Sequence, residues 1–217
     1  MELALDEDQR ALGTAARDIL GKICPPDAVR EARRSPCGAD GRLWARTAEM
    51  DLLGVAMPEE YGGLGGRDLE MAILLEEAGR VAFPGPLVEA CVAALTIAEY
   101  ADVERRRRWL PRLGEGSATA TLLLDDFLVA YAEQAGVAVV ARDGQLRLVP
   151  AAQLQVRSRL SADNVRPLSS VGVEPDAATL LTGDPAAAER LRAHGCRRRR
   201  VLREPRVSDC RGRCGSQ

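Results

Sequence analysis

The chain has 217 residues, of which 46% are hydrophobic and 29% are charged, a composition typical of a globular protein with one or two domains. The sequence has no apolar run as long as a membrane span, and its acidic start, MELALDEDQR, differs from the basic first region of a signal peptide. We therefore expect a cytoplasmic protein whose six cysteines, none of them in a CxxC pair, are free thiols.

Charge is distributed unevenly along the chain. From Arg190 to the last residue there are ten arginines and two acids, a net charge of +8, which leaves −10 for residues 1–189. The body therefore has the charge of an ordinary acidic domain. We expect residues 183–217 to form a separate segment, the start of a helix followed by an arginine-rich, irregular and disordered tail.

Five helices are predicted in residues 1–116. The first begins at the acids Asp6 to Asp8, continues with apolar side chains at helical spacing, and ends at Pro25-Pro26, which a loop follows. The four other helices are expected to begin at Asp40, at Asp68, at Pro86 and near Val103, the last one ending before Pro111.

The stretch MPEEYGGLGG, residues 57–66, concentrates glycine in the middle of this helical part. Two interpretations compete: a loop that cradles a phosphate, and a tight reversal between two helices. The glycines lie between two predicted helices, no GK[ST] follows, and the spacing does not match a GxGxxG turn after a strand. The sequence favours a structural reversal that binds no phosphate, with Tyr61 packed beside it.

The sequence changes character at Ser117. Short β-rich runs follow one another, separated by turn signals such as Asp143-Gly144, and the last clear strand lies in DNVRPLSSVGV at residues 163–173. Strands that follow helices, instead of alternating with them, indicate an α+β fold. We predict an all-helical domain at residues 1–116 followed by a small antiparallel β domain at residues 117–182.

Several residues capable of chemistry have simpler structural interpretations. The neighbouring acids Glu59-Glu60 and Glu76-Glu77 resemble general acid–base pairs, but solvated acids on a loop and on a helix explain them more simply. The single histidine, His194, lies in the arginine-rich end, and Cys210 and Cys214 lack the second pair of ligands that a zinc site needs. We predict no metal site and no catalytic residue among these groups.

Three runs, in this order, resemble the N-terminal half of the acyl-CoA dehydrogenases: LLGVAMPEEYGGLGG, LEMAILLEEAGRVAFPGP and ERRRRWLPRLGEGSATATLLL. The resemblance is good over residues 5–124 and continues weakly to 183. It implies a subunit with an N-terminal helical domain, a middle β domain and a C-terminal helical domain. Such a subunit binds FAD and oxidises acyl-CoA thioesters between Cα and Cβ, as in fatty acid or steroid side-chain β-oxidation.

One face of the predicted fourth helix is a candidate substrate contact. The residues Val88, Cys91, Val92 and Leu95 share this face, which is core by its apolar pattern. The resemblance assigns the same face to the acyl-chain channel as well. These four residues are the candidate site of the sequence, and no residue is assigned to the cofactor.

The middle domain departs from the family pattern. The T-E-P and G-S-D motifs, which contact flavin and substrate in the family, are missing after Thr121, where the sequence has LLLDD. DNVRPLSSV, in contrast, is similar to a strand near the end of the family's middle domain. A shortened domain of this kind resembles the non-catalytic partner subunits of heteromeric acyl-CoA dehydrogenases that act on steroid side chains. We therefore expect the chain alone not to retain FAD.

The end of the sequence departs as well. The family's catalytic glutamate lies in the C-terminal helical domain, where this chain has HGCRRRRVLREPRVSDCRGRCGSQ. Three interpretations stay open: a frameshifted or truncated gene product, a natural basic extension, and a segment that binds nucleic acid or an acidic partner. The function prediction is an acyl-CoA dehydrogenase-like chain that is inactive alone. It is either a partner in a homo- or hetero-oligomer with a full-length subunit or an inert product without cofactor.

Overall fold

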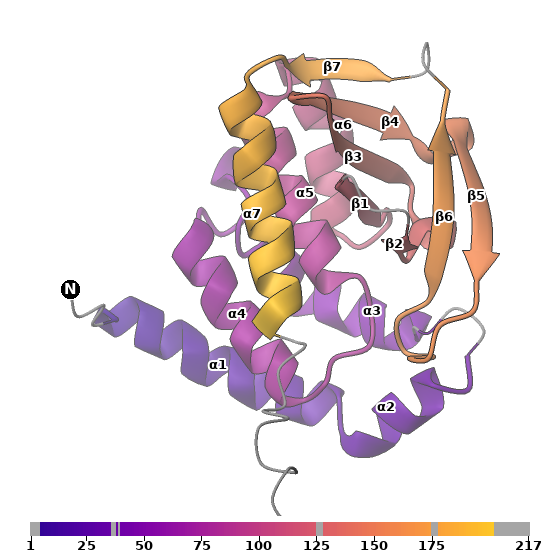
Figure 1. Cartoon of the computed structure of the whole chain (residues 1–217). Helices are drawn as coiled ribbons and strands as arrows, with labels where there is room; N and C mark the ends of the chain where they lie inside the picture. Colours follow the sequence, from indigo (N-terminus) through magenta and orange to yellow (C-terminus); the bar gives the residue numbers. More distant parts are fainter. Residues whose placement is uncertain (1–4, 36–37, 39, 125–127, 175–177, 202–217) are drawn as a thin grey trace, which may run out of the picture.

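Helices form the first half of the molecule (Figure 1). The computed structural model describes residues 5–35, 38, 40–124, 128–174 and 178–201. Before the first strand, these residues form the helices α1 (Glu7–Ile23), α2 (Pro26–Ala32), α3 (Gly41–Glu49), α4 (Asp68–Arg80), α5 (Leu87–Tyr100) and α6 (Val103–Gly114). None of the helices in the described part is long and apolar enough to cross a membrane.

Most of these helices begin where the sequence predicts, because their capping residues are local in sequence. Asp6 and Gln9 form a capping box, in which each side chain accepts a hydrogen bond from the backbone N–H of the other residue, at 2.8 and 3.1 Å. Asp40 and Asp102 each accept a hydrogen bond of 2.9 Å from a backbone N–H in the first turn of α3 and of α6. The predicted starts of α1, α3, α4, α5 and α6 are confirmed.

Two prolines correct the sequence-based assignment. Pro25-Pro26 ends α1 as predicted, but Pro26 also begins α2, because its fixed φ and missing N–H suit the first helical position. The sequence predicts that α6 ends before Pro111, yet this helix continues to Gly114. Leu110 and Leu113 are buried on either side of Pro111 and hold this last turn against the core.

α5 is the central helix of the molecule. Its side chains are buried on almost every side, and a continuous core packs them against other helices and against the first strands. α5 contacts α6, α7 (Pro185–Val201) and β1 (Ala120–Leu124). The core is therefore shared by the predicted domains 1–116 and 117–182, and the boundary between them stays a prediction.

Two small sheets follow the helices, with the strand orders β1-β3-β4-β7 and β2-β6-β5. The remaining strands are β2 (Val129–Ala130), β3 (Val137–Arg142), β4 (Gln145–Pro150), β5 (Leu154–Arg159), β6 (Leu168–Val173) and β7 (Thr179–Thr182). The predicted α+β fold is confirmed, with sheets that are mostly antiparallel. β1 and β3 form a parallel pair, however, because the chain leaves the first sheet to form β2 before β3 returns beside β1.

The predicted turn at Asp143-Gly144 joins β3 to β4. Both residues have positive φ, 52° and 72°, which a tight two-residue hairpin requires. The strands pair over their whole length, from Val137 opposite Pro150 to Arg142 opposite Gln145. This hairpin forms the centre of the first sheet.

α7 follows the sheets and lies along α5 (Figure 1). The carboxylate of Asp184 caps it by accepting a hydrogen bond of 2.9 Å from the N–H of Ala186. The sequence predicts an irregular tail after the helix start, but the helix extends to Val201, in a stretch rich in arginine and alanine, which favour helix. Its first turns are anchored on the core by Ala187, Ala188 and Leu191. The His194 side chain and residues 202–217, with the two cysteines considered as metal ligands, lie outside the described residues.

Candidate functional site

The candidate channel residues lie together on α5. Val88, Cys91, Val92 and Leu95, called the α5 strip below, all belong to one hydrophobic core cluster or pack against it. Cys91 and Val92 are each 1% exposed, whereas Val88 and Leu95 are partly buried. The strip is therefore packed at its centre and more open at its two ends.

α7 lies beside α5 and holds its C-terminal end. The guanidinium of Arg190 lies 5.9 Å from the centre of the Tyr100 ring and donates a hydrogen bond to the Tyr100 hydroxyl. The same guanidinium forms an ion pair with Glu99 at 3.7 Å. α5 also contacts β1 and β3. α7 contacts β1, β3 and β4 as well, so α5 and α7 pack together against the first sheet.

Two surface hollows lie away from the α5 strip. One, of about 140 Å³, lies between α6 and β4, against Trp109 and Leu148. The other, of about 500 Å³, lies between α2 and the ends of α1 and α4, against Val29, Cys24 and Val81. Burial raises the pKa of the Cys24 thiol to about 11, so this thiol is protonated and unreactive at neutral pH.

A buried ion pair joins α5 to the second sheet. Glu89, in the first turn of α5, has a side chain that is 3% exposed, and Arg166, in the turn between β5 and β6, has one that is 27% exposed. Nη2 of Arg166 donates to Oε1 of Glu89 at 3.0 Å. Neither residue has a role predicted from the sequence, because a contact between residues 77 positions apart is set by the tertiary structure.

Tyr131, directly after β2, supports the same turn. Its backbone N–H donates to the carbonyl oxygen of Pro167 at 3.1 Å, and its hydroxyl donates to that of Val165 at 2.8 Å. Its φ of 56° is unusual for a bulky residue and marks a conformation imposed by the surroundings. Burial and the nearby Glu89 carboxylate raise the pKa of the Tyr131 phenol well above its ordinary range, so the hydroxyl remains a neutral hydrogen-bond donor.

The glycine stretch is a reversal between helices, as predicted. The backbone N–H of every residue from 62 to 66 donates to a backbone carbonyl of residues 54–59, at 2.8 to 3.2 Å. A Cβ on Gly63 would lie 2.2 Å from the carbonyl oxygen of Met57, so the close approach of the two backbones requires glycine. Tyr61 packs against the core beside it. The N–H groups that would hold a phosphate are already engaged, which supports the prediction that no phosphate binds here.

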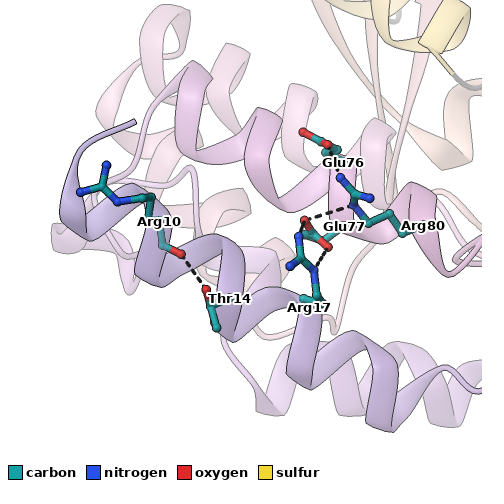
Figure 2. Close-up of polar contacts among 6 residues, drawn as sticks. All are labelled: Arg10, Thr14, Arg17, Glu76, Glu77 and Arg80. Atoms are coloured by element: carbon teal, nitrogen blue, oxygen red, sulfur yellow. Dashed lines mark hydrogen bonds and ion pairs between the residues drawn. The ribbon is translucent and has the colours of Figure 1, made fainter. Parts of the chain in front are cut away.

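Glu77 departs from the predicted solvated state, and Figure 2 shows its ion pairs with Arg17 and Arg80. Its side chain is 6% exposed. Arg17 of α1 binds it through two nitrogens, with Nε 3.0 Å from Oε2 and Nη2 2.7 Å from Oε1. Nε of Arg80 lies 3.3 Å from the same Oε1. Glu76, which pairs with Arg80, and the loop acids Glu59-Glu60 are exposed, as predicted.

The pKa of Glu77 identifies its role. The hydrogen bond from Arg17 lowers this pKa below its ordinary value, and this effect outweighs the burial that raises it. Glu77 therefore stays ionised and fastens α1 to α4, which is a structural role. Within the described residues, no three or more His, Cys, Asp or Glu side chains are grouped so as to hold a metal ion.

The described residues fit FAD, the cofactor that the resemblance implies, poorly. Thr121 on β1, where the family motifs would begin, is fully buried, and its hydroxyl donates to the carbonyl oxygen of Ala130 at 2.8 Å. Tyr131 and Arg166 are bound to the protein in the same way. The acids Asp125-Asp126 lie outside the described residues. The side chains of Thr121, Tyr131 and Arg166 are committed to protein partners.

Comparison with known proteins gives a matching family model and several relatives. Residues 6–117 match the model of the acyl-CoA dehydrogenase N-terminal domain. Acyl-CoA dehydrogenase IpdE2 of Mycobacterium tuberculosis is 32% identical over 196 residues, which cover 85% of this chain and 61% of that protein. IpdE2 of Mycolicibacterium smegmatis is 28% identical over 186 residues, which cover 85% of this chain and 57% of that protein. The chain thus spans about three fifths of the length of these relatives.

Solved structures show the same architecture. The structure of the Tcur3481-Tcur3483 steroid ACAD G363A variant has a TM-score of 0.80 and 26% identity, and the match covers 90% of this chain and 62% of that one. The ChsE4-ChsE5 complex from Mycobacterium tuberculosis has a TM-score of 0.78 and 19% identity, with coverage of 93% and 64%. The second likeness concerns the fold alone.

Proposed function

Because the chain belongs to the acyl-CoA dehydrogenase family, we propose that it forms part of an FAD-dependent enzyme that oxidises an acyl-CoA thioester between Cα and Cβ. Within a cytoplasmic complex it acts as a partner subunit, which supplies the helical part and the two small sheets. A second, full-length family subunit supplies the flavin site and the catalytic base.

The observation that supports the role of a partner subunit is that the buried carboxylates are engaged in ion pairs. The reaction requires a carboxylate in a water-poor pocket that is free to accept a proton from the substrate, and a flat electron acceptor on the other side. The buried carboxylates of the described residues are Glu77 and Glu89, and each is ion-paired with an arginine. The hydrogen bond from Arg17 lowers the pKa of Glu77 and so makes it a poorer base. Oε1 of Glu89 is occupied by the hydrogen bond from Arg166. Neither is suited to abstract the substrate proton.

The α5 strip is the proposed contact for the acyl group. Its four side chains are apolar, and Val88 and Leu95 leave its ends partly open. Apolar surface of this kind suits a hydrocarbon chain or a steroid side chain. The 26% identical structure, that of the Tcur3481-Tcur3483 steroid ACAD, supports a heteromeric setting with a ring-bearing substrate.

Co-expression tests this proposal. The chain is purified alone and together with a full-length family subunit from the same genome. Visible flavin absorbance and acyl-CoA-dependent reduction of an artificial electron acceptor are then measured on both samples. We expect the isolated chain to be colourless and inactive and the complex to hold flavin and turn over. Turnover by the isolated chain contradicts the partner role, and failure to bind any family subunit favours the alternative of an inert product.

A second experiment tests the α5 strip. Val88→Phe enlarges a side chain at one end of the strip, so the complex is expected to show a raised KM for acyl-CoA. Met50→Phe, which makes a similar change at an exposed position after α3, is the matched control and should leave KM unchanged. Equal KM values for the two variants would place the acyl group elsewhere.

A further inference from the structure

The turn between β5 and β6 is fastened to three separate parts of the molecule. Arg166 pairs with Glu89 on α5 at 3.0 Å. Tyr131 donates two hydrogen bonds to carbonyl oxygens of the turn. A Cβ on Gly38, between α2 and α3, would lie 2.6 Å from Pro167, so this loop also lies against the turn. Figure 1 shows the β5–β6 hairpin extending from the sheets toward the helices α2 and α3.

The shape of the turn does not depend on the side chain of Arg166. Asp163 accepts a hydrogen bond of 3.0 Å from the N–H of Val165 through its carboxylate, and its backbone carbonyl accepts one of 3.1 Å from the N–H of Arg166. The turn is therefore formed by local bonds, and the Arg166 side chain is left to join it to α5. Its guanidinium connects the second sheet to the helical part.

The partner of Arg166 is next to a residue of the α5 strip in the sequence. Glu89 follows Val88 directly and precedes Val92 by less than one helical turn. The backbone of one helical turn moves as a unit, because its hydrogen bonds fix the residues relative to one another. The contact that holds Glu89 against the second sheet therefore also fixes Val88, at the open end of the strip.

We propose that Arg166 is a positioning residue for the acyl-CoA substrate. Through Glu89 it fixes the position of the first turn of α5. It thereby sets the space available to the acyl group beside Val88, at that end of the α5 strip. It makes no contact with the substrate itself. This inference rests on the proposed function, since it requires that the acyl group lies along the strip.

The test compares three variants in the assembled complex with its full-length partner. Arg166→Gln removes the charge, Arg166→Lys keeps it without the planar guanidinium, and Arg157→Gln removes an exposed arginine from β5 in the same hairpin as a control. Octanoyl-CoA and cholyl-CoA serve as linear and ring-bearing probes. Binding is measured by calorimetry, and KM and kcat are measured separately.

We expect Arg166→Gln to weaken binding of at least one probe about tenfold or more, within the range that a misplaced substrate produces. KM should rise more than kcat falls. Arg166→Lys should lie between Arg166→Gln and the unchanged complex, and Arg157→Gln should match the unchanged complex. Wild-type binding by Arg166→Gln overturns the inference, and so does an equal loss in the Arg157→Gln control. If Arg166→Gln does not fold, wild-type binding by Arg166→Lys has the same meaning.

Hydrogen exchange separates failure of this inference from failure of the proposed function. If the unchanged complex binds neither probe, the proposed function fails. The structural part of the inference, that Arg166 fixes the first turn of α5, is then decided by the exchange of backbone N–H groups in the Arg166→Gln variant. Faster exchange in the first turn of α5, with unchanged exchange in α1 and α4, supports it. Unchanged exchange in α5 overturns it.

Discussion

Two buried glutamates are paired with arginines in different regions, and the exposure of the partners separates the two regions. Glu77 on α4 meets Arg17, whose side chain is 61% exposed, at the rim between α1 and α4. Glu89 on α5 meets Arg166, which is 27% exposed, between the helices and the second sheet. Glu77 has a second arginine, Arg80, at 3.3 Å. We infer that the pair Arg17–Glu77, called the rim pair, is replaceable. The pair Arg166–Glu89, called the junction pair, determines how the second sheet is placed against the helices.

Removing the arginine of the junction is expected to have the largest effect. Arg166→Ala leaves the Glu89 carboxylate buried without this partner, which costs about 3–5 kcal/mol of the free energy of unfolding for a buried pair. Glu89→Ala should cost less, because the remaining Arg166 is partly exposed and can turn toward water. Chemical denaturation of both variants measures the difference. A larger loss of stability in Glu89→Ala would contradict the idea that Glu89, the more buried of the two, depends more on its partner than Arg166 does.

Changing the glycine reversal before α4 is expected to give the next largest loss of stability. The result shows whether α4 is held in place by the Glu77 ion pair alone or also by this reversal. Gly63→Ala would place a Cβ 2.2 Å from the Met57 carbonyl oxygen and is expected to cost about 1–3 kcal/mol through overpacking. Gly62→Ala is the matched control. It meets no atom within 4 Å, and its φ of 84° costs about 1 kcal/mol. If thermal unfolding shows equal losses of stability for the two variants, the close approach of the two backbones is not the reason that position 63 requires glycine.

Removing the rim arginine should have a smaller effect. Arg17→Ala leaves Glu77 paired with Arg80. Because the side chain of Arg17 is exposed, its ion pair is screened by water and contributes little to stability. We expect a loss of stability well below that of Arg166→Ala, and one that shrinks further when salt is added. Arg10→Ala on the same helix is the control for the change in helix composition. A loss as large as that of Arg166→Ala would mean that the two regions do not differ.

The pH dependence of Glu77 gives the smallest expected effect. Its folded pKa is lowered, so its contribution to stability is present above its ordinary value of 4.5 and is lost as the pH falls through the folded value. Glu77→Gln removes this contribution and should flatten the decline of stability on the acid side below pH 4.5. Unfolding curves recorded across that range measure it. An unchanged acid slope would show that the folded pKa is not lowered.

Features fixed by neighbouring residues were predictable from the sequence. The starts of α1, α3 and α6 follow from Asp6, Asp40 and Asp102, which accept hydrogen bonds within their own first turns. The hairpin at Asp143-Gly144 follows from residues that tolerate positive φ. The family resemblance likewise depends on contiguous runs, and the match to residues 6–117 confirms it.

Features fixed by distant residues were not predictable in this way. The parallel pairing of β1 with β3 depends on where the chain crosses between sheets, which no local pattern records. Glu77 and Glu76 are adjacent and chemically identical, and Arg17, 60 residues from Glu77, is what makes one of them structural. Glu89 has the same dependence on Arg166. The candidate α5 strip was found because its spacing is helical, and its use by a substrate stays a prediction.

The flavin content of the purified complex tests the central claim, the partner role, most directly. Flavin released by denaturation is quantified against the amount of each chain, determined separately, in a complex of this chain with its full-length partner. If this chain supplies no flavin site, the flavins equal the full-length partner chains in number, and removing the partner removes all of them. One flavin for every chain, or flavin that stays with this chain after separation, would contradict the account.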